Sequence, residues 1–285
     1  MAMADQLTSG EAFADLSSWR KVAVTGRDSF GWLNDLVSAD LSKLTAGRAL
    51  QSLLLSPTGR VRAEFTAALH GEQVVLLQDP TQPGAIDALL SMYVLSSDVT
   101  LTDRTDALAL FAVPGLVDAP DSVMAAASAP SCLGAGVDLI ASGADHDPVR
   151  AALATTLGEA GPEEVEAWRV MTGLPRVGVD ATGDDLPQEC GLSSAVAFDK
   201  GCYLGQEAVA KVRNLGHPRR ILLHMESESA VSRGAALHVN GSKAGEVTSA
   251  LFADGRTVLL AKVRWDLREG PFRTAGGAAL TPRWR

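Results

Sequence analysis

The last part of the chain, residues 219–285, consists of short extended runs separated by turn residues. Asn240–Gly241 and Asp254–Gly255 are pairs typical of the two-residue type I′ turns that join antiparallel strands, because both turn positions need a positive φ. Short strands joined in this way bury their apolar faces by forming a barrel or a sandwich. The sequence therefore predicts a small C-terminal β-barrel or sandwich over residues 218–285.

An α+β pattern precedes this region. Residues 21–25 predict a strand, and Asp28 is a candidate N-cap for the helix that follows it. Three extended runs separated by turn residues come next and predict an antiparallel meander: residues 49–55, 61–69 and 74–77. Pro83 then begins a second helix. We expect these elements to form a first α+β lobe over residues 1–97.

A similar order of elements returns further along the chain. The pattern predicts, in order, a strand over 107–113, a helix over 121–127, a strand over 137–141 and a helix over 147–157. Val22–Gly26 and Phe111–Gly115 are alike and each precedes a predicted helix, which suggests a degenerate duplication. Strand, glycine and helix in succession are common, so the likeness also fits two unrelated units. We expect a second α+β lobe over residues 98–217.

Composition excludes several classes of protein. The 285 residues correspond to about two domains, and 46% hydrophobic with 21% charged residues is typical of a globular protein. The longest wholly apolar run, Ala107–Val113, is far shorter than the roughly 20 residues of a transmembrane helix. The first residues lack the basic and apolar regions of a secretory signal. We therefore expect a cytoplasmic protein without a membrane segment.

The cysteines and the charge narrow the choice further. Three cysteines cannot all pair within the chain, and none forms a CxxC motif, which argues against a disulfide framework and a zinc site. We expect no bound metal. Thirty-four acidic against 25 basic residues give a net charge of −9, which disfavours direct binding to nucleic acid. Nothing in the sequence requires more than a monomer.

The segment Lys200–Glu207 (KGCYLGQE) carries the most specific chemistry in the chain. Its glycines, Gly201 and Gly205, allow a positive φ and a close approach by another group. Cys202 precedes a predicted helix and lies near Lys200, and both a helix N-terminus and a cation favour the thiolate. The alternative is that Cys202 is a small buried apolar residue, which is also our interpretation of Cys132 and Cys190.

This segment resembles the signature of the YgfZ family, folate-binding proteins related to the T-protein of glycine cleavage, an aminomethyltransferase. The agreement extends beyond the signature. Further stretches resemble the family's opening strand, turn and helix, its first hairpin and the stretch before the signature: Leu16–Trp19 with Val24–Ser29, Leu54–Val61 and Trp168–Pro175. The resemblance implies a T-protein-like α+β fold, with two duplicated lobes around a central folate cavity and a small β-barrel.

The resemblance also assigns roles to residues. It implies that the protein binds tetrahydrofolate or a derivative and supports the assembly or repair of iron–sulfur client enzymes, including enzymes that modify tRNA. Cys202 would be the functional thiol, and we expect it to be solvent-reachable at the mouth of the cavity. The other signature residues would shape its loop: Lys200, Gly201, Tyr203, Gly205, Gln206 and Glu207. Trp19 and Trp168 would face the folate, although packing in the core is the alternative for both.

The anionic end of a folate needs a cation. Arg169, Arg176, Arg213 and Arg219 are candidates that the sequence does not rank, and we take Arg169 as the residue that binds the folate.

The chain also departs from the T-protein pattern. T-proteins carry an Asp–Asp pair after the first hairpin turn, whereas here Thr58–Glu64 contains no aspartate, and Met171–Thr172 replaces a Glu–Ala pair. Without Glu64 as a substitute, aminomethyl transfer lacks its acid–base group. We therefore favour an accessory folate-binding protein. The alternatives are a tetrahydrofolate-dependent one-carbon transferase and a binding module that takes no folate.

Overall fold

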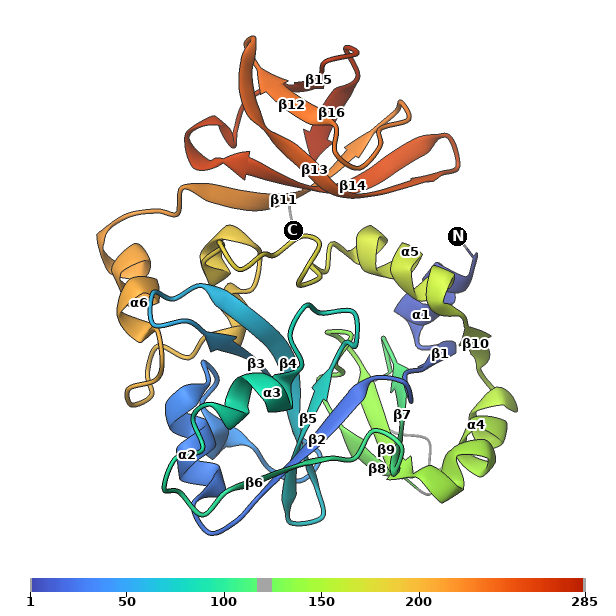
Figure 1. Cartoon of the computed structure of the whole chain (residues 1–285). Coiled ribbons are helices and arrows are strands. Elements are labelled where there is room, and N and C mark those ends of the chain that lie inside the picture. The colour runs from blue at the N-terminus through green and yellow to red at the C-terminus, as the bar shows by residue number, and fades with distance from the viewer. Residues whose placement is uncertain (1, 117–124, 284–285) are drawn as a thin grey trace.

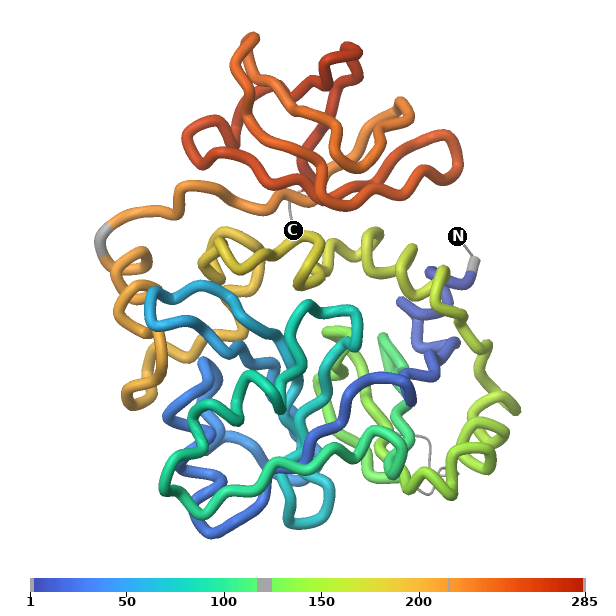
Figure 2. The backbone as a smooth tube through the Cα atoms, in the orientation of Figure 1, coloured from blue at the N-terminus to red at the C-terminus, as the bar shows by residue number. Residues whose placement is uncertain are grey.

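The computed structural model describes residues 2–116 and 125–283. Two five-stranded sheets lie side by side, and a closed six-stranded barrel sits at one end of the molecule (Figure 1). The segment between α5 and α6 passes between the barrel and the sheets (Figure 2). This arrangement confirms the predicted α+β class with a C-terminal barrel. No helix in the described parts of the chain is long and apolar enough to cross a membrane.

The first sheet is antiparallel throughout and has the strand order β3-β4-β5-β2-β6. Its strands are β2 (Arg20–Thr25), β3 (Leu50–Leu55), β4 (Val61–His70), β5 (Gln73–Gln78) and β6 (Thr100–Asp103). The consecutive pairing of β3, β4 and β5 confirms the predicted meander. The helices α2 (Ser29–Leu36) and α3 (Ile86–Ser91) pack their apolar residues against this sheet in one core cluster.

The second sheet has the order β10-β1-β7-β9-β8. Its strands are β1 (Ala12–Asp15), β7 (Leu108–Val113), β8 (Ala126–Ser128), β9 (Val137–Ser142) and β10 (Gly158–Ala160). The neighbouring helices are α1 (Ala2–Ser9), α4 (His146–Ala154) and α5 (Pro162–Thr172). The expected helix over 121–127 is wrong at its end, because residues 126–128 pair with β9 as a strand. Residues 121–124 lie outside the described residues.

The two sheets do not follow the expected division of the chain at residue 97. Strand β1, from the N-terminal segment, pairs with β7 and β10 in the second sheet. Strand β6, beyond residue 97, pairs with β2 in the first sheet. Each sheet therefore contains a strand from the other side of the predicted boundary. Local periodicity does not reveal this exchange, because it carries no information on which strands pair. The internal duplication stays a prediction.

The C-terminal barrel closes in the order β11-β14-β13-β12-β15-β16. Its strands are β11 (Arg220–Ser227), β12 (Ala236–Val239), β13 (Ser242–Ala253), β14 (Arg256–Arg264), β15 (Phe272–Thr274) and β16 (Ala279–Pro282). Asn240–Gly241 and Asp254–Gly255 join neighbouring strands, and all four residues have a positive φ. The predicted type I′ turns are therefore confirmed. Closure leaves no free sheet edge.

Buried charges attach the barrel to the segment that follows α5. Asp185 is fully buried and pairs with Arg220 on β11 and Lys262 on β14. These partners hold the pKa of Asp185 below its usual range, although burial alone would raise it. Removing one partner of a buried pair leaves an uncompensated charge, so the contact fixes the barrel over this segment. Within the described residues, the remaining α-helix is α6 (Gln206–Leu215), and five short 3-10 helices lie at residues 41–43, 143–145, 187–189, 193–195 and 265–267.

Candidate functional site

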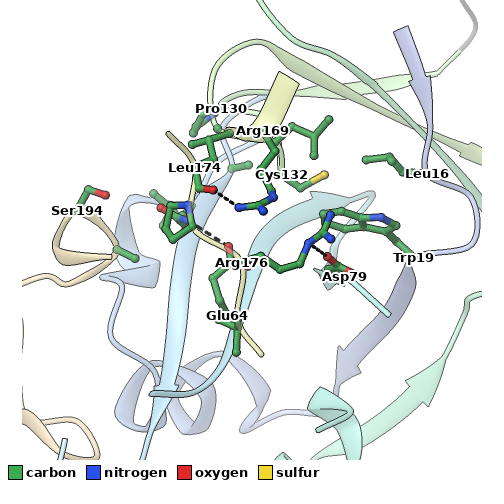
Figure 3. A pocket seen from close by; sticks show the side chains of 18 of the residues that line it. Leu16, Trp19, Glu64, Asp79, Pro130, Cys132, Arg169, Leu174, Arg176 and Ser194 are labelled. Atoms are coloured by element: carbon green, nitrogen blue, oxygen red, sulfur yellow. Dashed lines mark hydrogen bonds and ion pairs between the residues drawn. The ribbon is translucent and has the colours of Figure 1, made fainter. Parts of the chain in front are cut away.

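A cavity of about 920 Å³ lies where the two sheets meet. Its wall combines residues that are far apart in the sequence, including Leu16 and Trp19 after β1, Gln51 on β3, Glu64 on β4 and Cys132 before β9. Figure 3 shows how several of these side chains converge. The volume is in the range of small-molecule sites, and the wall mixes apolar surface with a few polar groups.

Trp19 lies on the cavity wall, as the resemblance implied. Its ring is partly buried and packs against the core of the second sheet. The fully buried Lys21 holds its backbone, because the Lys21 ammonium donates to the carbonyl oxygens of Ser17 (2.7 Å) and Trp19 (2.9 Å). Burial lowers the pKa of Lys21 to about 8. The Lys21 ammonium therefore fixes the backbone of the loop that carries Trp19.

A carboxyl group and two amides form a polar cluster on the same wall. Gln51 Nε2 donates to Glu64 Oε1 at 3.1 Å, and Gln82 Nε2 lies 3.3 Å from Glu64 Oε2. Gln82 also receives the backbone N–H of Glu64 and donates to its carbonyl, which fixes the amide. Burial raises the pKa of Glu64 to about 7, and the nearby Asp79 carboxylate acts in the same direction. Glu64 can therefore hold or release a proton near neutral pH.

The cavity also contains a thiol that the sequence interpretation treated as purely structural. Cys132 lies on the wall, and its Sγ is 3.5 Å from Asp138 Oδ1. Asp138 accepts two further hydrogen bonds, from Ser131 Oγ and from the backbone N–H of Cys132. Burial raises the pKa of Asp138 to about 6, and burial together with this carboxyl group raises the pKa of Cys132 well above its usual range. The thiol is therefore a protonated, partly apolar contact for a ligand.

Arg169 lines the cavity, but its guanidinium is engaged by the protein. Its nitrogens donate to both carboxylate oxygens of Glu166, to Asp180 and Ser249, and to the carbonyl of Leu174. These five hydrogen bonds match the five N–H donors of a guanidinium. Arg169 therefore ties α5 to the next segment and to β13, and has no donor left for a folate tail.

Trp168 does not lie on the cavity wall. Its side chain is 3% exposed, packs in the core of the second sheet and donates from Nε1 to Thr8 Oγ1 at 3.1 Å. It joins α5 to α1, which lie side by side in Figure 1. The expected contact between Trp168 and folate is therefore not supported, and the packing alternative describes its position.

Cys202 is exposed, as expected, but it is not among the residues that line the cavity. Lys200 points elsewhere: its Nζ lies 2.6, 2.9 and 2.7 Å from the carbonyl oxygens of Asn34, Val37 and Ala39. This ammonium satisfies carbonyls at the C-terminal end of α2, and burial lowers its pKa to about 8. Helix α6 begins four residues after Cys202, at Gln206, so the thiol does not lie in its first turn.

The rest of the signature forms a tightly packed bend. Gly205 has a φ of +81°, and a Cβ there would lie 2.4 Å from the carbonyl oxygen of Ser56 in the first hairpin turn. Tyr203 is buried, with its ring centroid 5.3 Å from Lys200 Nζ, whereas Gly201 and Glu207 are exposed. Gln206 donates its backbone N–H to the carbonyl of Tyr203. Lys200 and Gly205 thus attach the Cys202 loop to the end of α2 and to the first hairpin turn. A role of Gly201 and Glu207 in shaping the loop stays a prediction.

Comparisons with known proteins agree with this architecture. The sequence model of the GCVT N-terminal domain matches residues 4–125. A tRNA-modifying protein YgfZ from Vibrio vulnificus is 26% identical, over 90% of this chain and 85% of its own. The aminomethyltransferase T of the glycine cleavage system from Bartonella henselae superposes with a TM-score of 0.81 at 18% identity, over 99% of this chain and 88% of its own. The chain is a YgfZ-like protein with the T-protein fold.

The sequence similarity extends to a protein that is not named YgfZ. A putative chloroplastic transferase from Arabidopsis thaliana is 23% identical over 86% of this chain, and the aligned stretch spans only 63% of the plant protein.

In this YgfZ-like protein, only one of the other three arginines considered for the folate tail lies on the cavity wall. Arg176 lies on the cavity wall but pairs with Glu166 at 2.8 Å and with Asp79 at 3.4 Å. Arg213 stacks over Phe198 at 4.1 Å, and neither Arg213 nor Arg219 lines the cavity. Across the described ranges, no group of three or more His, Cys, Asp or Glu side chains is arranged to hold a metal ion.

Proposed function

We propose that the protein binds a reduced folate in the cavity and serves as an accessory protein for iron–sulfur enzymes, including enzymes that modify tRNA. The observation that carries the folate part is the wall itself, where the Trp19 ring, the Gln51–Glu64–Gln82 cluster and the Cys132 thiol line one hollow. The iron–sulfur part rests on the resemblance to the YgfZ family.

The residues present fit a pterin. A pterin is a flat heteroaromatic ring that needs stacking surface and a few directed polar groups. Trp19 offers a large rigid face, and the Glu64 carboxyl with its two amide partners offers donors and acceptors. A Glu64 that is partly protonated near neutral pH can accept from a ring N–H or donate to a ring nitrogen.

Isothermal titration calorimetry with tetrahydrofolate tests the ligand. The wild-type protein should bind, and Trp19→Ala should weaken binding about tenfold, since one aromatic stacking contact is worth about 1–1.5 kcal/mol. Trp265→Ala, which removes a tryptophan stacked on His217 outside the cavity, is the matched control. Absence of binding by the wild type would favour a binding module that takes another ligand.

The iron–sulfur role is tested through Cys202. Because this thiol is exposed and off the cavity wall, we expect it to meet a partner protein rather than the folate. Deleting the gene should lower the activity of particular cluster enzymes, and Cys202→Ala should fail to restore it. Cys190→Ala, which alters a buried thiol, is the control and should restore activity. Full rescue by Cys202→Ala would remove this thiol from the mechanism.

A tetrahydrofolate-dependent one-carbon transferase is the second candidate, and the position of Glu64 favours it. A carboxyl group in the cavity with a pKa of about 7 suits general acid–base chemistry and could replace the missing aspartate pair. Folate-dependent methylene transfer from an aminomethyl carrier should then be lost in Glu64→Gln. Turnover by the wild type that disappears in this variant would establish the enzyme over the accessory protein.

A further inference from the structure

Four basic side chains line the cavity, and three of them are neutralised by acidic neighbours. Lys43 pairs with Asp40 and Asp199, each at 3.3 Å. Arg169 and Arg176 share Glu166 and also pair with Asp180 and Asp79, respectively. An anionic group entering the cavity would have to compete with these carboxylates for each of the three cations.

Arg48 is the exception. It lines the cavity, is exposed, and its guanidinium makes no hydrogen bond or ion pair within residues 2–116 and 125–283. Its backbone is nonetheless well held. Arg48 forms a bridge with Ala129, and the next residue, Ala49, donates its N–H to the Ala129 carbonyl at 2.8 Å. A fixed backbone thus presents a free guanidinium at the rim of the cavity.

The chain runs inward from this point. Ala49 is fully buried, and Gln51, at the beginning of β3, reaches the Glu64 carboxylate. Three residues of extended chain span roughly 10 Å, so the free cation and the polar cluster lie at separate places along the wall. A folate has the same layout, because an aminobenzoyl spacer separates its pterin from its glutamate.

We propose that Arg48 is the anion-binding end of the cavity and receives a carboxylate of the ligand's tail, while the ring lies by Trp19 and Glu64. The inference rests on the proposed function for the identity of the ligand. Arg48 suits the task because a guanidinium can bind a carboxylate with two parallel hydrogen bonds. It replaces Arg169, whose donors are all engaged, as the cation for the glutamate.

Isothermal titration calorimetry with two ligands tests this assignment. Tetrahydrofolate carries the charged glutamate, and its dimethyl ester keeps the ring and spacer without the charge. Arg48→Gln should bind tetrahydrofolate about two- to fivefold more weakly than the wild type, as expected for a solvent-exposed ion pair, and should bind the ester unchanged. Arg48→Lys should retain part of the affinity. Arg62→Gln, an exposed arginine of β4 off the cavity wall, is the matched control and should behave as wild type.

The outcomes separate the two proposals. If the wild type binds tetrahydrofolate and Arg48→Gln binds it equally well, the Arg48 assignment is overturned while the folate cavity stands. An equal loss for the ester would also overturn it, because the effect would then not depend on the charge. If the wild type binds neither ligand, the proposed function fails and the assignment to a folate tail fails with it.

Discussion

The signature loop at 200–207 and the cavity differ in how each is encoded. The loop is one continuous segment whose residue types are visible in the sequence at once. Two of its residues hold backbone in place: the Lys200 ammonium donates to carbonyls at the end of α2, and the Gly205 backbone packs against the turn at Ser56. The cavity is assembled from both sheets and several connecting segments, and its residues stand singly in the sequence.

This difference explains why the signature loop is easy to recognise in the sequence and the cavity wall is not. Close packing of one backbone on another restricts several neighbouring positions together, so it produces a recognisable string. A ligand wall restricts isolated positions, each on a different element. The motif therefore identifies the fold of this YgfZ-like protein, whereas the cavity identifies the surface that a ligand would touch.

Substitution of Gly205 gives the strongest test that the signature loop has a structural role. Gly205→Ala should destabilise the protein by about 3 kcal/mol, because the residue has a positive φ and its new Cβ would lie 2.4 Å from the Ser56 oxygen. Gly201→Ala is the control, since nothing lies within 4 Å of its Cβ position. Urea unfolding measures both. Equal stabilities for the two variants would contradict a structural role for the bend.

The cavity side is tested by the pH dependence of stability. The pKa of Glu64 is raised from 4.5 to about 7, so the folded protein holds this proton more tightly than the unfolded chain. The stabilisation that results from this pKa difference is fully present below pH 4.5 and is lost as the pH rises through about 7.

Glu64→Gln removes this titration. The fall in unfolding free energy between pH 5 and pH 8 should be about 2 kcal/mol smaller in the variant than in the wild type. Denaturant unfolding at a series of pH values measures the difference. Parallel pH profiles for the two proteins would show that folding does not raise the pKa of Glu64.

Lys200 sharpens the distinction between anchoring and chemistry. Lys200→Met should lower the free energy of unfolding by about 1–2 kcal/mol, because it leaves carbonyls at the end of α2 without their donor. Lys211→Met, at an exposed position of α6, should have little effect. Thermal unfolding compares them. If Lys200→Met is as stable as the control but does not restore the activity of cluster enzymes in cells that lack the gene, the lysine acts in chemistry rather than in anchoring.

Cys202 itself should matter least for stability. Because it is exposed, Cys202→Ala should change the free energy of unfolding by less than about 0.5 kcal/mol. In the native protein, iodoacetamide should modify Cys202 quickly and the other two thiols slowly, since Cys190 and Cys132 have raised pKa values. Mass spectrometry after timed quenching checks this order, and faster modification of Cys190 than of Cys202 would contradict it.

Local patterns predicted many of the elements, but not α1, β1, β6 or β10, and they did not predict how the strands assemble into sheets. The barrel and its turns followed from Asn240–Gly241 and Asp254–Gly255, because a positive φ at two successive residues is a local requirement. The transfer of β1 to the second sheet was invisible, since a four-residue strand carries no signal about its partner.

The site was predicted only in part for the same reason. Trp19 was found through the resemblance, but Cys132 and Arg48 reach the wall through contacts between distant segments. Arg169 looked like a free cation until its partners on α5, β13 and the intervening segment were in place. Periodicity does not report such partners.

Hydrogen–deuterium exchange with and without tetrahydrofolate tests most directly whether the cavity, and not the signature loop, is the ligand site. We expect the folate to slow exchange in peptides covering residues 16–19, 48–52 and 130–135 and to leave exchange in residues 200–207 unchanged. Protection confined to residues 200–207, with no change around the cavity, would contradict it.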